Sequence, residues 1–184
     1  MKSLRTWHVT LTLVAVACGT DEEVYASDCA DFDACDEQSG PQDNLCINEF
    51  MASNSWTTPD ENGAYSDWIE IHNPNEETVS LTGLTITDDL TDPEKHILVD
   101  LEIEGGEYLL FWADGTEDAK DTHLPFKLDQ GGESLGLFHA DGSVIEALDY
   151  DTQATDFSAS RIPDCSDAWE IVDEPTPETS NGER

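Results

Sequence analysis

Apolar and polar residues between positions 45 and 172 alternate in short runs that are separated by Gly, Pro, Asn and Asp. No window in this region keeps a helical period over three turns, whereas short runs with closely spaced turn signals are typical of strands. The pattern therefore predicts an all-β sandwich or barrel. The predicted strands cover residues 45–51, 67–72, 84–87, 96–103, 107–112, 133–138, 143–150 and 169–172.

Two glycine-containing turns predict hairpins between these strands. Residues 104–106 (Glu-Gly-Gly) separate the fourth and fifth runs, and residues 140–142 (Ala-Asp-Gly) separate the sixth and seventh. Glycine, and Asp followed by Gly, readily adopt the positive φ that tight hairpin turns require.

The run around Trp68 indicates a strand that is covered on both faces. Because side chains alternate along a strand, Trp68 and Glu70 share one face, and Ile69 and Ile71 share the other. Each face thus carries a large apolar residue. We expect a central strand whose two isoleucines lie in the core between the sheets, while Trp68 is covered from outside.

Glu49 and Glu70 are acidic residues within apolar strands. Buried carboxylates are normally paired or hydrogen-bonded, because the desolvation of an isolated charge is costly. We expect each to accept hydrogen bonds from nearby backbone amides or to pair with Arg161, which is the only basic residue in the C-terminal strands. A cation or ligand site is the alternative that the sequence leaves open.

The N-terminal segment has the pattern of an export signal. Lys2 and Arg5 precede a mainly apolar stretch at residues 9–17, which is too short to cross a membrane as a helix. The expected organisation is a signal peptide at 1–17, an acidic tether at 18–44, a β-sandwich at 45–173 and a flexible C-terminal tail at 174–184.

Residues 15–19 (Ala-Val-Ala-Cys-Gly) resemble a bacterial lipobox. In that motif the cysteine, here Cys18, is diacylated and becomes the first residue of the mature protein, which the lipid then anchors to a membrane. Ala15 departs from the motif, in which leucine is commoner at that place. The alternative is ordinary cleavage after Ala17 or Ala26, which would give a freely secreted protein.

The four other cysteines form an even set, as expected for disulfides in an oxidising compartment. They allow three connectivities, of which we favour Cys29–Cys35, within the acidic tether, and Cys46–Cys165, between the start and the end of the domain. The longer loop is worth about 4–5 kcal/mol in the chain-entropy model. The sequence contains no CxxC pair of the kind that binds zinc.

The 184-residue chain has 42 acidic and 7 basic residues, and its formal net charge is -35. Such a charge repels phosphates, so we expect no nucleic-acid partner, and it favours cations and basic proteins. Acidic residues crowd three segments, namely Asp28, Asp31, Asp33, Asp36 and Glu37, then Asp88, Asp89 and Asp92, and then Asp114, Glu117 and Asp118. None matches a known calcium loop, so no cofactor is expected, and calcium is the alternative.

Residues 132–136 (Gly-Glu-Ser-Leu-Gly) match the G-x-S-x-G pattern of serine hydrolases. That pattern works on a strand-turn-helix elbow, with acidic and histidine partners further along the chain. Here Leu137 and Phe138 continue a strand, and His139 lies too close to Ser134 to act as its base. We therefore assign no catalytic residue.

Six blocks of the chain, in the right order between residues 45 and 182, resemble the lamin tail domain of bacterial type. They are INEFMASN (47–54), DWIEIHNP (67–74), LTGLTITD (81–88), GGESLGL (131–137), DGSVIE (141–146) and SRIPD (160–164). The family's Pro-Thr-Pro-Gly ending is matched by residues 175–177, but Glu178 replaces the glycine. The expected structural motif residues in these blocks are Asn48, Glu49, Trp68, Glu70, Asn73, Gly83 and Arg161.

The resemblance implies an immunoglobulin-like β-sandwich and a non-catalytic interaction domain, which in bacteria occurs on exported proteins. The expected function is thus an envelope-anchored or secreted interaction or adhesion module. Its expected partners are a membrane, through a lipid at Cys18, and an unidentified protein or glycan. A small extracellular hydrolase and a calcium-dependent structural domain are the alternatives.

Overall fold

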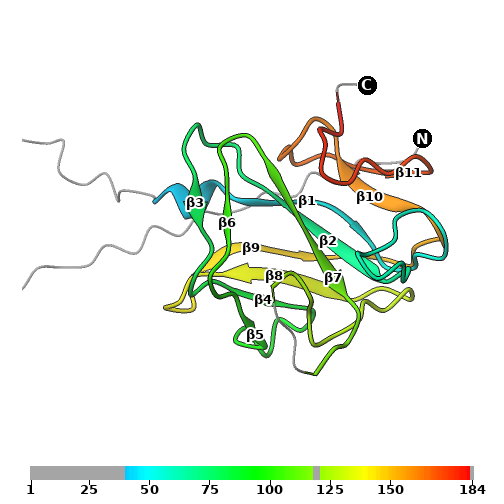
Figure 1. Cartoon of the computed structure of the whole chain (residues 1–184), viewed down its shortest axis with the longest axis horizontal. Coiled ribbons are helices and arrows are strands. Elements are labelled where there is room, and N and C mark those ends of the chain that lie inside the picture. Colours follow the sequence, from blue (N-terminus) through cyan, green and yellow to red (C-terminus); the bar gives the residue numbers. More distant parts are fainter. Residues whose placement is uncertain (1–39, 118–120, 183–184) are drawn as a thin grey trace, which may run out of the picture. The chain divides into compact units, whose positions relative to one another are not determined.

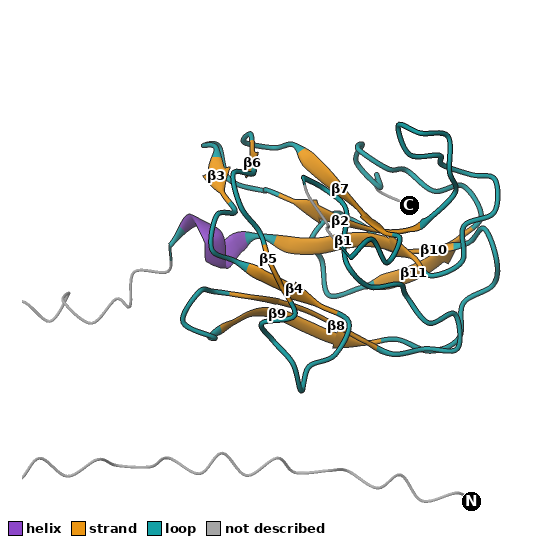
Figure 2. Ribbon diagram, turned by 60° about the horizontal axis from the view of Figure 1, so that its bottom comes forward, coloured by secondary structure: helices purple, strands orange, loops and turns teal. Residues whose placement is uncertain are grey.

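The computed structural model describes residues 40–117 and 121–182. These residues form an all-β domain of antiparallel sheets, which confirms the expected fold class (Figures 1 and 2). A short 3-10 helix, η1 (Pro41–Asn44), precedes the first strand. The expected signal peptide at 1–17, the lipidation site Cys18 and the Cys29–Cys35 disulfide lie outside the described residues. Within the described part, no helix has the length and apolar character that a membrane crossing requires.

Two sheets pack against each other, one of five strands in the order β11-β10-β1-β2-β7 and one of four in the order β5-β4-β8-β9. A separate two-stranded sheet pairs β3 with β6. In chain order the strands are β1 (Cys46–Met51), β2 (Asp67–His72), β3 (Val79–Ser80), β4 (Thr85–Thr87), β5 (His96–Ile97), β6 (Glu102–Ile103), β7 (Tyr108–Ala113), β8 (Ser134–Phe138), β9 (Val144–Asp149), β10 (Ser158–Arg161) and β11 (Trp169–Val172).

The apolar core lies between the five-stranded and four-stranded sheets. Its inward-facing side chains include Ile47, Phe50, Ile69, Ile71 and Phe111 from the first sheet and Ile86, Leu135 and Leu137 from the second. Burying each of them contributes about 1.5–3 kcal/mol relative to leaving it exposed. The alternation of apolar residues along the strands therefore holds the two sheets together.

Strand β2 is covered on both faces, as its sequence predicts. It lies between β1 and β7, and its two isoleucines belong to the core between the sheets. On the opposite face Trp68 is fully buried in a second apolar cluster with Met51, Leu110 and Trp112.

The region expected as one strand at residues 96–103 forms two strands. Asp100, between them, has a φ of 55°, which breaks the extended path, so β5 pairs with β4 while β6 pairs with β3. The turn at 104–106 consequently closes no hairpin, because β7 pairs with β2. Gly105 instead allows the backbone of residue 105 to lie close to that of Glu76, since a Cβ at residue 105 would lie 2.2 Å from the carbonyl oxygen of Glu76. The hairpin expected at 140–142 is present and joins β8 to β9.

Residues 174–182, which follow β11, pack on the five-stranded sheet, whereas a flexible tail was expected at 174–184. Asn181 is only 5 % exposed. The backbone amides of Thr176 and Glu178 donate hydrogen bonds to carboxylates of β1 and β2. Buried carboxylates need donors, and this segment provides them, so the domain includes residues 174–182.

A disulfide joins Cys46 at the start of β1 to Cys165 after β10, across a sequence separation of 119 residues. It is one of the two pairings favoured from the sequence. Because the bridge closes such a long loop, it removes much of the conformational freedom of the unfolded chain.

We predict that replacing Cys46 and Cys165 together by serine lowers the free energy of unfolding by about 2–5 kcal/mol. Chemical denaturation measured by tryptophan fluorescence tests this. A reducing agent should destabilise the original protein by a similar amount and the double variant much less. Equal sensitivity of the two proteins to the reducing agent would contradict the prediction.

Candidate functional site

The outer face of the five-stranded sheet, which is turned away from the four-stranded sheet, carries a buried polar cluster. Glu49 of β1 lies directly opposite Glu70 of β2, and both side chains have no exposed surface (0 %). Residues opposite each other in an antiparallel pair have Cβ atoms about 4.5–5.5 Å apart. The register shifts between Ile47 and Glu49, so that Asn48 also lies in this cluster.

Glu49 accepts hydrogen bonds from two elements that lie far away in the sequence. One carboxylate oxygen accepts from the hydroxyl groups of Ser158 and Ser160 on β10, the second at 2.8 Å. The other oxygen accepts from the backbone amide of Thr176 at 3.1 Å. The side chain is therefore held by donors on β10 and on the C-terminal segment.

Glu70 is held in the same way by fewer donors. Its two carboxylate oxygens accept from the side-chain amide of Asn48, at 3.2 Å, and from the backbone amide of Glu178, at 2.5 Å. Glu178 has a φ of 61°, a conformation that favours glycine, at the place where the family ending has glycine. The expectation of backbone donors is thus confirmed for both glutamates, although the donors come from the C-terminal segment.

Arg161 pairs with neither buried glutamate, which corrects the alternative expected for it. Its guanidinium group pairs with Glu146 of β9 and donates to the carbonyl oxygen of Ile47 at 2.9 Å. It also lies over the ring of Trp169, 4.5 Å from the ring centroid. Arg161 therefore joins β9, β1 and β11 at the edge of the sandwich.

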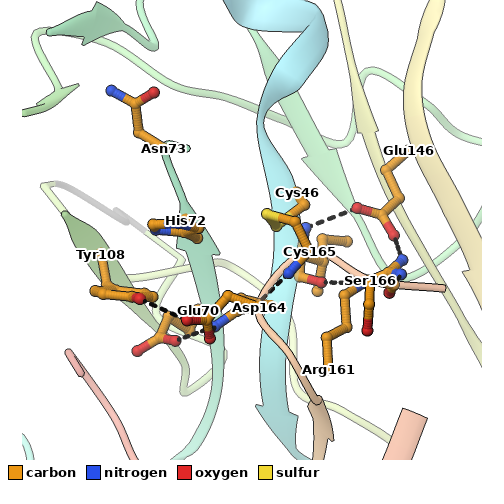
Figure 3. The surroundings of a disulfide bond; sticks show 12 residues. Cys46, Glu70, His72, Asn73, Tyr108, Glu146, Arg161, Asp164, Cys165 and Ser166 are labelled. Carbon is orange, nitrogen blue, oxygen red and sulfur yellow. Dashed lines mark hydrogen bonds and ion pairs between the residues drawn. A yellow bond between two sulfur atoms is a disulfide. The ribbon is translucent and has the colours of Figure 1, made fainter. Parts of the chain in front are cut away.

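Asp164 completes the polar cluster, and no pattern in the sequence indicated its role (Figure 3). It accepts from Asn48 at 3.0 Å, from the hydroxyl group of Tyr108 at 3.0 Å, and from the backbone amide of Asn181 at 2.9 Å. The neighbouring Cys165 is fixed by the disulfide, and its amide donates to Asn48 at 3.1 Å. The covalent bridge thus places Asp164 beside β1.

Asn181 is the second residue of this cluster that the sequence did not indicate. Its side-chain amide donates to the carbonyl oxygens of Asn48 and Arg161, at 3.2 and 2.9 Å. The side-chain carbonyl oxygen of Asn181 accepts from the hydroxyl group of Thr176 at 2.6 Å. The only signal available was its closeness to the matched ending at residues 175–177.

Burial governs the titration of the glutamate pair. It raises the pKa of Glu70 to about 8, against the hydrogen bonds from Glu178 and Asn48, and the nearby charges of Glu49 and Asp164 act in the same direction as burial. Burial also raises the pKa of Glu49, against the hydrogen bonds from Ser158, Ser160 and Thr176. At neutral pH Glu70 is therefore mostly protonated, which removes one of two adjacent charges.

Asp164 behaves in the opposite way. Burial acts to raise its pKa, but hydrogen bonds from Ser180, Asn181, Asn48 and Tyr108 outweigh burial and lower it. Burial and the hydrogen bond to Asp164 raise the pKa of Tyr108 to about 12. Asp164 is thus the ionised acceptor around which the hydroxyl and amide donors gather.

The other motif residues lie in two places away from this cluster. The side-chain amide of Asn73 donates to the carbonyl oxygens of Glu77, Ile103 and Glu104, and so fixes the turn after β2. Gly83 has a φ of 90°, which only glycine adopts without strain.

Ser134 lies on strand β8 and has none of the surroundings of a hydrolase nucleophile. Its hydroxyl group donates directly to Asp149, its partner on β9, at 2.6 Å. The ring of His139 is bonded to Asp43 at 2.6 Å, and that of His123 to Asp114 at 2.6 Å. Neither histidine is placed to take a proton from the serine.

In the acidic turns, for which calcium was the alternative to the absence of a cofactor, the carboxylates contact groups of the chain itself. Asp88 pairs with Lys95, and Asp89 accepts from the amide and the hydroxyl group of Thr91. Within residues 40–117 and 121–182, no group of three or more His, Cys, Asp or Glu side chains is arranged to hold a metal ion. The segment with Asp28 to Glu37, like Asp118, lies outside the described residues.

We predict that Glu70→Gln reduces the dependence of stability on pH. A carboxyl group whose pKa is raised in the folded state makes its full contribution to stability at pH values below its unfolded-state pKa, here 4.5. This contribution is lost as the pH rises through the folded-state pKa of about 8. The original protein should therefore lose on the order of 5 kcal/mol across this window from Glu70 alone. Urea unfolding at several pH values tests this, with the exposed Glu104→Gln as the control. Parallel pH profiles of the original protein and Glu70→Gln would contradict it.

We also predict that a chain ending at Asp173 is less stable by about 2–4 kcal/mol, because each lost hydrogen bond contributes roughly 1 kcal/mol. In that chain the pKa of Glu70 should fall towards its ordinary value, since water reaches the carboxylates. Carbon-detected NMR titration measures this directly. A chain ending at Gly182 is the matched control and should keep both properties. An unchanged Glu70 titration after the longer truncation would show that the segment does not bury the pair.

The family model of the lamin tail domain matches residues 38–152, which is more than half of the chain. No curated protein matches the sequence. The lamin tail domain is typically non-catalytic, in agreement with the use of the buried carboxylates as hydrogen-bond acceptors within the fold. The chain therefore belongs to the lamin tail domain family.

Proposed function

We propose that this protein is an exported, non-catalytic interaction module that a lipid on Cys18 attaches to a bacterial cell envelope. There it displays its lamin tail domain for a protein or glycan ligand. The observation that carries the proposal is the lamin tail domain itself, whose family model matches residues 38–152.

The distribution of polar groups supports a binding role over a catalytic one. Glu49 and Glu70 have no exposed surface, and their carboxylate oxygens accept hydrogen bonds from β10, Asn48 and the C-terminal segment. A general acid or base must reach a substrate proton. Acids held in this way stabilise the fold and leave the surface for binding.

The Cys46–Cys165 disulfide supports export. Disulfides persist in oxidising compartments and are rare in the reducing cytosol. The bridge also fixes Asp164 beside β1, so the polar cluster depends on it. A fold that relies on such a bridge suits a compartment outside the cytoplasm, as does the N-terminal pattern with Lys2 and Arg5 before an apolar stretch.

The net charge supports attachment by lipid. With a formal charge of -35, the chain is repelled by the anionic surfaces of membranes, so electrostatic adsorption is excluded. Stable attachment then requires acyl chains, and two or more of them, because a single chain binds only reversibly. Diacylation of Cys18 meets this requirement.

We predict that Cys18→Ala releases the protein from the membrane fraction and abolishes the incorporation of labelled fatty acid. The test expresses the full chain in a bacterium that lipidates exported proteins, followed by carbonate washing of the membranes. Cys29→Ala is the matched control and should stay membrane-bound. Retention of the Cys18→Ala protein in washed membranes would overturn the anchor.

The interaction part is tested with the same Cys18→Ala chain, because this chain carries no lipid that could insert into a membrane. The fluorescently labelled chain should bind intact cells of the producing organism saturably, and unlabelled chain should compete. Binding that neither saturates nor yields to the competitor would overturn the proposed interaction function.

A further inference from the structure

The dipeptide Asn-Gly occurs twice in the sequence, as Asn62-Gly63 in the loop between β1 and β2 and as Asn181-Gly182 in the C-terminal segment. An asparagine side chain loses ammonia readily in this dipeptide, because glycine has no side chain that hinders attack by its backbone nitrogen. The two copies share this intrinsic reactivity. Any difference between them in the folded chain therefore comes from their surroundings.

The first copy is open to water. Asn62 and Gly63 are both exposed, and a Cβ placed on Gly63 would meet no atom within 4 Å. The side-chain amide of Asn62 donates to the exposed Glu61 at 3.2 Å, and it makes no other hydrogen bond within the part of the chain that the structure describes. The N–H of Gly63 donates to the carbonyl oxygen of Asp60 at 3.0 Å. Hydrogen bonds of such an exposed turn open readily, so the reacting groups are free to meet.

The second copy is enclosed. Asn181 is only 5 % exposed, and three hydrogen bonds hold its side chain. Its nitrogen donates to the carbonyl oxygens of Asn48 and Arg161, at 3.2 and 2.9 Å, and its oxygen accepts from the hydroxyl group of Thr176 at 2.6 Å. The carbonyl carbon of this side chain can meet the backbone nitrogen of Gly182 only after the C-terminal segment has opened locally.

We propose that Asn62 is a site of spontaneous deamidation in the folded protein, and that the fold protects Asn181 from the same reaction. A base removes the proton of the Gly63 backbone nitrogen, which then attacks the side-chain carbonyl carbon of Asn62 and expels the amide nitrogen as ammonia. Water opens the resulting succinimide at either carbonyl group. The products are aspartate and isoaspartate, and the reaction takes up a water molecule for each ammonia that it releases.

Conversion of Asn62 changes the surface of the loop between β1 and β2. Each product places a further carboxylate beside Asp60 and Glu61. Isoaspartate also lengthens the backbone by a carbon atom, which disturbs the turn that two hydrogen bonds between Asp60 and Ala64 close, each at 2.8 Å. The contact between Glu61 of this turn and the ring of His123, at 2.9 Å, is disturbed with it.

Conversion of Asn181 would disturb the fold itself. Its side-chain nitrogen is a donor to two backbone carbonyl oxygens, and an ionised carboxylate in its place has no proton to donate. The new charge would also lie in the cluster that already contains Glu49, Glu70 and Asp164. The hydrogen bonds that hold the C-terminal segment on the sheet thus also preserve it chemically.

The experiment incubates the full Cys18→Ala chain at neutral pH in heavy-oxygen water and follows both asparagines by peptide mass spectrometry. Hydrolysis of the succinimide introduces a heavy oxygen atom, so conversion during the incubation is distinguished from earlier conversion. Asn62 should convert about a hundredfold faster than Asn181, since each of the three hydrogen bonds that hold Asn181 contributes a factor of about five. In guanidinium chloride with a reducing agent the two rates should become similar, because both copies are then exposed.

Gly63→Ala should slow the conversion of Asn62 several-fold and leave Asn181 unchanged, because the added methyl group hinders attack by the backbone nitrogen. Gly142→Ala is the matched control, since this glycine also has a positive φ and no atom within 4 Å of an added Cβ. It should change neither rate.

Three results would overturn the proposal, and none depends on the ligand or the anchor of the proposed function. If Asn62 stays intact in the folded chain while the denatured chain converts, the reactive site is refuted. If Asn181 keeps pace with Asn62 in the folded chain, the protection is refuted. If Gly63→Ala converts at the original rate, the reaction does not pass through attack by residue 63.

Discussion

The burial of two carboxyl groups opposite each other on β1 and β2 is the constraint on which the rest of this domain depends. Placing Glu49 and Glu70 out of contact with water costs several kcal/mol each unless donors surround them. One member lowers this cost by binding a proton, as the raised pKa of Glu70 shows. The oxygens of the two carboxyl groups also accept hydrogen bonds from hydroxyl and amide donors of β10 and the C-terminal segment. The outer face of the sheet is therefore closed by polar contacts, whereas the inner face is closed by apolar ones.

This constraint explains which elements the sequence could predict and which it could not. Strand β2 was predicted with its bounds and both faces, because Trp68, Ile69 and Ile71 alternate as a covered strand does. Strand β10 was missed, because its Ser-Ala-Ser-Arg sequence has little β propensity. It becomes a strand because its two serines bind Glu49, more than a hundred residues away. No local pattern records such a contact.

The residues of the candidate site, like the strands, could be predicted only in part. Glu49 and Glu70 were recognisable as acids in apolar runs, and the Cys46–Cys165 pairing followed from the position of the cysteines at the ends of the domain. The role of Asp164 was not recognisable, because it depends on the bridge that brings it beside Asn48. Arg161 was assigned to the wrong partner, since its strand places it at the edge of the sandwich, where Glu146 lies. In each case the missing information was the pairing of distant strands.

The same division between the two faces bears on function. The polar groups that most resemble catalytic machinery are enclosed by the chain itself, so they cannot meet a substrate without displacing the C-terminal segment. A ligand of this lamin tail domain must therefore contact residues other than these buried carboxylates.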